Sequence, residues 1–130
     1  MNENGMASIV NTTGNPDGHI VLRGGSKGPN FETDHVRRIS SDLKQSNLPY
    51  KVMIDCSHGN SNKDFRKQSE VLKNIASQIS NGEKNILGVM LESHLKEGNQ
   101  KLLKKEDLQF GRSITAVSYT HLTLPTIMPV

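Results

Sequence analysis

The sequence contains a single cysteine, no tryptophan, and only 4% aromatic residues. One thiol cannot build an internal disulfide framework, which excludes the disulfide-rich secreted class and fits a reducing compartment. No apolar run approaches the roughly 18 residues that a membrane helix needs, and the first residues lack the basic-then-apolar pattern of a signal peptide. We therefore expect a cytoplasmic protein that makes no membrane contact.

The excess of basic over acidic residues is also small. Lys and Arg number 16 against 13 Asp and Glu, for a net charge of +3 in 130 residues. The basic residues are spread thinly along the chain, whereas nucleic-acid-binding proteins usually concentrate them on one face. We expect no nucleic-acid partner. The length suits one domain, although every acidic and basic residue lies at or before Arg112 and residues 113–130 carry none.

Three apolar runs alternate with two segments of helical periodicity. The predicted strands are His19–Arg23, Lys51–Asp55 and Asn85–Glu92, and the predicted helices are Thr33–Gln45 and a segment from Ser61 or Asn62 to Ser80. The first helix places Val36, Ile39 and Leu43 on one stripe, with Thr33 or Asp34 as its cap. The second places Phe65, Leu72, Ile75, Ala76 and Ile79 on its stripe. Continuous apolar strands suggest burial on both faces, as in a parallel sheet covered by helices.

The resulting order, β-α-β-α-β, predicts an α/β fold with right-handed crossovers, either a doubly wound sheet or a (β/α) barrel. Arg23, His58 and Glu92 end or follow successive strands at intervals of about 35 residues. Equivalent loops would bring them to the C-terminal end of the sheet, where (β/α) barrels carry their chemistry. A full barrel has eight strands in about 250 residues. Three strands are fewer than half of that number, so we interpret the chain as a fragment.

These three side chains are the candidate site. Imidazole is a common metal ligand and acid–base group, and His58 lies in a loop of small polar residues; the alternative is a hydrogen-bonded loop histidine. Glu92 ends a buried strand and needs a partner such as a metal, unless it is simply solvated. Arg23 precedes a glycine-rich loop that suits phosphate, although such a loop alone is weak evidence. Cys56 is expected to pack at its strand end.

Four stretches closely resemble the type I (microbial) 3-deoxy-D-arabino-heptulosonate 7-phosphate (DAHP) synthases. They are Gly14–Asp17 with His19–Gly25, Met53–Lys63, Gly88–His94 with Glu97–Gln100, and Gly111–Thr115. The resemblance covers about residues 6–115. It implies the C-terminal part of a (β/α)8 TIM barrel, about its last three β/α units.

The resemblance implies the first step of the shikimate pathway, in which phosphoenolpyruvate and erythrose 4-phosphate condense and release phosphate. Arg23 would hold the phosphate of phosphoenolpyruvate. His58 and Glu92 would be ligands of a divalent metal of the Mn, Fe, Co or Zn type, with His58 also near the reacting carbons. The intact enzyme would be a homo-oligomer.

Two departures accompany the resemblance. The other two metal ligands of the family are a cysteine in the N-terminal half and an aspartate directly after Ser-Ile-Thr, where this chain has Ala116. From that residue onward the sequence no longer resembles the family. We therefore divide the chain into residues 1–115, the barrel part, and residues 116–130, a tail that we expect to be disordered or artefactual. The fragment alone is expected to be inactive.

Two other functions stay open at this point. One is another phosphate-handling (β/α)-barrel enzyme, such as an aldolase or a sugar-acid phosphate synthase. The other is a small anion-binding module, which would need clustered basic residues and strongly salt-dependent binding.

Overall fold

The computed structural model describes residues 5, 7, 9–102, 104–114 and 119–120. The main elements are β1 (Ile20–Leu22), α1 (Thr33–Gln45), β2 (Val52–Asp55), α2 (Gln68–Ser80) and β3 (Ile86–Met90). The shorter elements are η1 (Phe65–Lys67), β4 (Ser93–His94), β5 (Lys96–Asn99), η2 (Lys105–Asp107), β6 (Arg112–Ser113) and β7 (Tyr119–Thr120). The predicted alternation of strands and helices, and the α/β class, are confirmed.

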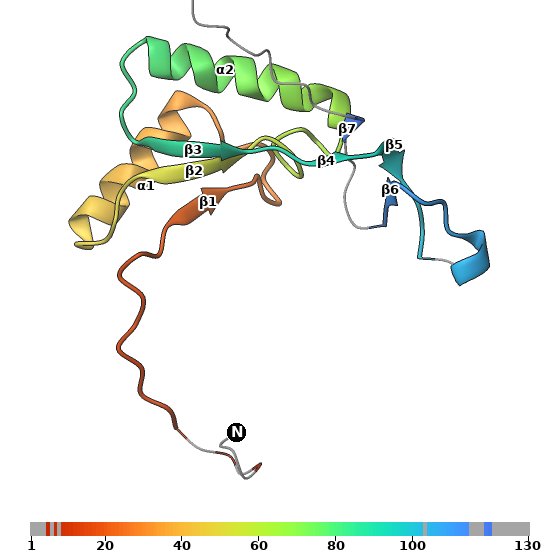
Figure 1. The fold of residues 1–130 in the computed structure, drawn as a ribbon. Coiled ribbons are helices and arrows are strands. Elements are labelled where there is room, and N and C mark those ends of the chain that lie inside the picture. The colour runs from red at the N-terminus through yellow and green to blue at the C-terminus, as the bar shows by residue number, and fades with distance from the viewer. Residues whose placement is uncertain (1–4, 6, 8, 103, 115–118, 121–130) are drawn as a thin grey trace, which may run out of the picture.

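The three main strands form one parallel sheet in the order β1-β2-β3 (Figure 1). Leu22 is opposite Ile54, and Asp55 is opposite Met90, so all three strands end at the same edge. The register shifts once between Val52 and Met53, where β3 has an extra residue. Each crossover moves one place in the same direction, so chain order and strand order coincide.

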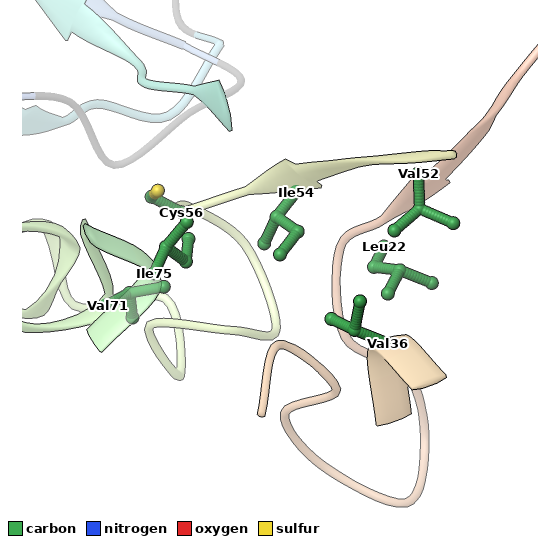
Figure 2. Packing of buried hydrophobic residues seen from close by; sticks show 7 residues of the cluster. All are labelled: Leu22, Val36, Val52, Ile54, Cys56, Val71 and Ile75. Atoms are coloured by element: carbon green, nitrogen blue, oxygen red, sulfur yellow. The ribbon is translucent and has the colours of Figure 1, made fainter. Parts of the chain in front are cut away.

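Both helices pack on one face of this sheet. Alternate residues of a strand share a face, and β2 presents Val52 and Ile54 to the helices. Cys56, the residue after the strand, packs in the same cluster, and all three are fully buried. Figure 2 places Val36 of α1 toward the β1 end of this cluster and the α2 side chains near Cys56. The complete buried cluster is Leu22, Val36, Val52, Ile54, Cys56, Val71 and Ile75.

The opposite face of the sheet is open. Val21 and Met90, which lie on this face, keep 37% and 43% of their surface exposed. The expectation of burial on both faces was therefore wrong for this chain, because the two helices cover only one of them. Within the part of the chain that the structure describes, the sheet has three strands and does not close into a barrel.

The first helix has the predicted bounds, and its stripe is confirmed, since Ile39 and Leu43 pack against the cluster that contains Val36. Its N-cap, however, is Glu32, which makes no side-chain capping bond. Neither Thr33 nor Asp34 is the cap, because both already lie inside the helix. The cap assignment was wrong by one or two residues.

The second helix begins at Gln68 rather than at Ser61 or Asn62. Asn62 and Lys63 have φ values of 52° and 60°, a left-handed backbone that an α-helix cannot contain. Phe65 belongs to the short helix η1 instead. The predicted stripe was only partly correct: Ile75 is buried and Leu72 partly buried, whereas Ala76 and Ile79 are exposed and the buried Val71 had not been included.

Short strand pairs lie beyond the C-terminal ends of β1–β3, where β4 pairs with β7 and β5 with β6 (Figure 1). The pair of β4 with β7 uses Tyr119 and Thr120 of the predicted tail. The rest of the tail, including Ala116, lies outside the described residues, so the division at residue 115 stays a prediction. Among the residues that are described, no helix combines the length and apolar character needed to cross a bilayer.

Candidate functional site

The three candidate residues follow the C-terminal ends of the three parallel strands. Arg23 comes directly after β1, His58 lies in the loop after β2, and Glu92 is the second residue after β3. Because the strand ends are in register, the backbones of all three lie at the same edge of the sheet. The prediction of a common edge is confirmed.

His58 lies between two carboxylates. Its Nδ1 is 2.8 Å from Oδ2 of Asp55, and its Nε2 is 3.4 Å from Oε1 of Glu92. The residue has φ 47°, and its carbonyl accepts a 2.7 Å hydrogen bond from the backbone N–H of Lys63. The imidazole is thus held by its loop, with one ring nitrogen bonded to β2 and the other directed at the end of β3.

Asp55 is the residue that sequence reasoning missed. It is the last residue of β2, and its side chain is only 4% exposed. One carboxylate oxygen accepts the backbone N–H of Ser57 at 2.8 Å, and the other faces the His58 ring. The signal available in the sequence was an aspartate at the end of an apolar strand, three residues before a histidine.

Glu92 is oriented from both its side chain and its backbone. The Ser57 hydroxyl donates to Oε2 of Glu92 at 2.9 Å, which leaves Oε1 facing His58. The buried side chain of Gln68 donates to the Glu92 carbonyl at 3.2 Å and accepts its N–H at 3.0 Å. The first residue of α2 therefore fixes where β3 ends, which sequence periodicity did not indicate.

The side chain of Arg23 is exposed and makes no hydrogen bond or ion pair with any residue that the structure describes. The site therefore brings His58 and Glu92 together directly, whereas Arg23 shares only their edge of the sheet.

The backbone after Arg23 is tightly placed. Gly24 has φ +77°, and a Cβ added there would lie 2.5 Å from the carbonyl carbon of Gly59, so only glycine fits. The Gly24 N–H donates to Oδ1 of Asn30 at 2.7 Å, and the Asn30 N–H donates to Oδ1 of Asn60 at 2.8 Å. The loops after β1 and β2 are thus joined at the edge that carries the candidate residues.

Imidazole nitrogen and carboxylate oxygen form a donor pair that suits divalent ions of the Mn, Fe, Co or Zn type. His58 Nε2 and Glu92 Oε1 face each other. The other ring nitrogen of His58, Nδ1, is bonded to Asp55, and the other carboxylate oxygen of Glu92, Oε2, is bonded to Ser57. Within the described residues, no group of three or more His, Cys, Asp or Glu side chains is placed to hold an ion. The pair fits two positions of a metal's coordination shell, and further ligands would have to come from elsewhere.

Cys56 is not part of this chemistry. Its side chain is fully buried in the cluster under the sheet, as expected from the sequence. Burial, together with the neighbouring Asp55 carboxylate, raises the pKa of the Cys56 thiol to about 12. Since only the thiolate is nucleophilic, this cysteine is inert at neutral pH.

Comparisons with known proteins show which proteins this chain resembles. The chain is 50% identical over 115 residues to a tyrosine-inhibited phospho-2-dehydro-3-deoxyheptonate aldolase of Schizosaccharomyces pombe, and 53% identical over 111 residues to a Phe-sensitive one of Escherichia coli. Each match covers 85% of this chain and 31% of the relative. The chain thus spans about a third of the length of these relatives.

A solved structure of the aldolase of the same name from Francisella tularensis matches with a TM-score of 0.75 and 48% identity, over 83% of this chain and 31% of that one. A family model described as the DAHP synthetase I family matches residues 1–123. The chain belongs to the DAHP synthetase I family.

Proposed function

We propose that this chain is part of a DAHP synthase, a transferase that condenses phosphoenolpyruvate with erythrose 4-phosphate and releases phosphate. The observation that carries the proposal is the convergence of His58 Nε2 and Glu92 Oε1, 3.4 Å apart, at the edge where all three strands end. That convergence occurs in a chain of this family, and its relatives carry the name of an aldolase of a phosphorylated sugar acid.

We also propose that β1, β2 and β3 are neighbouring strands of a (β/α)8 barrel, about its last three β/α units. Three features support this. The strand order follows the chain order, both helices lie on one face, and the other face exposes apolar residues such as Val21 and Met90. A doubly wound sheet would have helices on both faces. The interior of a barrel is filled by apolar side chains. In a complete barrel, side chains from the other strands would cover the apolar residues that are exposed on the open face of this chain.

In this proposal the residues have distinct roles. When bound, a divalent metal of the Mn, Fe, Co or Zn type would act as a Lewis acid that polarises the aldehyde oxygen of erythrose 4-phosphate. His58 Nε2 and Glu92 Oε1 would hold it, with Glu92 oriented by the Ser57 hydroxyl. The guanidinium of Arg23, exposed and without a protein partner among the described residues, would bind the phosphate of phosphoenolpyruvate through paired N–H···O bonds. A cytoplasmic location is proposed from the single cysteine and the sequence pattern of the first residues, and a homo-oligomeric intact enzyme is proposed from the resemblance.

The proposal is tested by transplanting residues 6–115 into the Escherichia coli relative in place of its matching segment, with 53% identity across the match. The recipient then supplies the remaining ligands, including the position that corresponds to Ala116. The chimera should release phosphate only when both substrates and a divalent metal are present. The 130-residue chain alone should release none with any metal, because it has two of the four protein ligands that the family uses.

Matched substitutions in the chimera separate chemistry from folding. Arg23→Ala and His58→Ala should each abolish phosphate release. Arg38→Ala and His19→Ala, which change exposed residues away from the C-terminal ends of the strands, should leave it nearly unchanged. A folded chimera without activity, or full activity after His58→Ala, would show that the proposed function is wrong.

A further inference from the structure

We propose that Asp55 is a positioning residue, which holds the neutral His58 ring with its proton on Nδ1 and so leaves the lone pair of Nε2 facing Glu92. The use of that lone pair as a metal ligand rests on the function proposed above. The tautomer itself is a property of this chain, whatever the chain binds.

The geometry favours one tautomer of the two. Nδ1 of His58 is 2.8 Å from Oδ2 of Asp55, within ordinary hydrogen-bond range, whereas Nε2 is 3.4 Å from Oε1 of Glu92. A carboxylate only accepts hydrogen bonds, so the shorter contact requires the proton on Nδ1. The longer contact leaves Nε2 as the free acceptor atom.

The carboxylate of Asp55 is better placed than that of Glu92 to decide the tautomer. Its side chain is 4% exposed, against 27% for Glu92, so water competes less for it. Its other oxygen is held by the N–H of Ser57, and its backbone carbonyl accepts from the Asn60 amide at 2.8 Å. Asp55 is therefore fixed at both ends and cannot turn away from the ring. Histidine ligands of metals commonly donate their second ring N–H to a carboxylate in this way.

The same bonds predict what asparagine would do at this position. The Ser57 N–H is a donor and still needs an oxygen at the position of Oδ1. In Asp55→Asn the amide oxygen therefore occupies that position, and the NH₂ group faces Nδ1 of His58. Nδ1 must then accept, so the ring proton moves to Nε2 and the lone pair facing Glu92 is lost. A merely structural Asp55 would not reverse the tautomer.

The test uses the full 130-residue chain with ¹⁵N-labelled histidine, at a pH where the ring is neutral and without metal or substrate. Long-range ¹H–¹⁵N spectra show which ring nitrogen carries the proton. His58→Asn identifies the His58 signals by their loss, and asparagine tolerates the φ of 47° at that position. The wild-type ring should carry its proton on Nδ1, and Asp55→Asn should carry it on Nε2. Asp42→Asn, an exposed aspartate on α1, should match the wild type.

Protonation at Nε2 in the wild type, or at Nδ1 in a folded Asp55→Asn variant, overturns the proposal. If that variant does not fold, the tautomer measured in the wild type still tests the proposal, because it must carry the proton on Nδ1. The result is also separate from the proposed function. An inactive chimera with the expected tautomer would refute the synthase but leave the positioning role intact, and an active chimera with the opposite tautomer would do the reverse.

Discussion

Replacing Gly24 by alanine tests how rigidly the loops after β1 and β2 are held together. The residue has φ +77°, and the added Cβ would lie 2.5 Å from the carbonyl carbon of Gly59 and 2.7 Å from the nitrogen of Asn60. A left-handed backbone costs alanine about 1–2 kcal/mol. The overlap is with backbone atoms, which cannot rotate away, and forcing such atoms apart costs about 1–3 kcal/mol more. We expect Gly24→Ala to lower the free energy of unfolding by about 2–5 kcal/mol.

Two glycines of the same loop separate these contributions. Gly28 has φ +109° but no atom within 4 Å of its added Cβ, so Gly28→Ala should show backbone strain alone, about 1–3 kcal/mol. Gly25 has neither a left-handed backbone nor an atom within 4 Å of an added Cβ, so Gly25→Ala should change the free energy of unfolding by less than about 0.5 kcal/mol. Urea denaturation followed by far-ultraviolet circular dichroism measures all three, because the chain has no tryptophan. If Gly25→Ala were as costly as Gly24→Ala, neither the strain nor the contact with Gly59 would explain the loss.

Two further predictions concern titratable groups that take no part in the candidate site. Burial by itself raises the pKa of Glu83, but hydrogen bonds from the Asn85 N–H and the Arg37 guanidinium outweigh it, and the pKa lies below its usual 4.5. Its contribution to stability is therefore complete above pH 4.5 and lost as the pH falls through the folded-state pKa. The urea midpoint of Glu83→Gln should accordingly decline less on acidification than that of the wild type, and an equal decline would contradict this. The Cys56 thiol, with a pKa raised from 9.0 to about 12, should react with an alkylating reagent about a thousandfold more slowly in the native chain than in urea, and comparable rates would refute its burial.

Sequence patterns identified the elements whose residues pack against apolar neighbours. The helical period of α1 could be recognised because Val36, Ile39 and Leu43 all belong to the buried cluster or pack against it. The strands could be recognised as runs rich in β-branched residues. The same patterns did not show which sheet face is covered. An apolar run looks alike whether one face or both are buried, and Val21 and Met90 turned out to be exposed.

The segment before α2 could not be predicted from periodicity, because polar side chains decide its path. The loop contains left-handed residues at His58, Asn62 and Lys63, and the His58 carbonyl accepts the N–H of Lys63. These bonds depend on the three-dimensional arrangement of the loop, and they produce no periodic pattern in the sequence. The positions of the candidate site residues were predictable from strand order, whereas the contact of His58 with Asp55 depended on this loop and was not.

The candidate site is held together by polar bonds among the strand ends rather than by the apolar cluster. The buried amide of Asn60 donates to the carbonyls of Leu22 and Asp55, which ties the end of β1 to the end of β2. Gln68 ties the end of β3 to the start of α2 through both backbone groups of Glu92. Since a lost bond would leave a buried polar group unsatisfied, these links tolerate little displacement. The exposed apolar side chains of the open face, such as Val21 and Met90, make none of these bonds, so the strand ends and their loops set the spacing of His58 and Glu92.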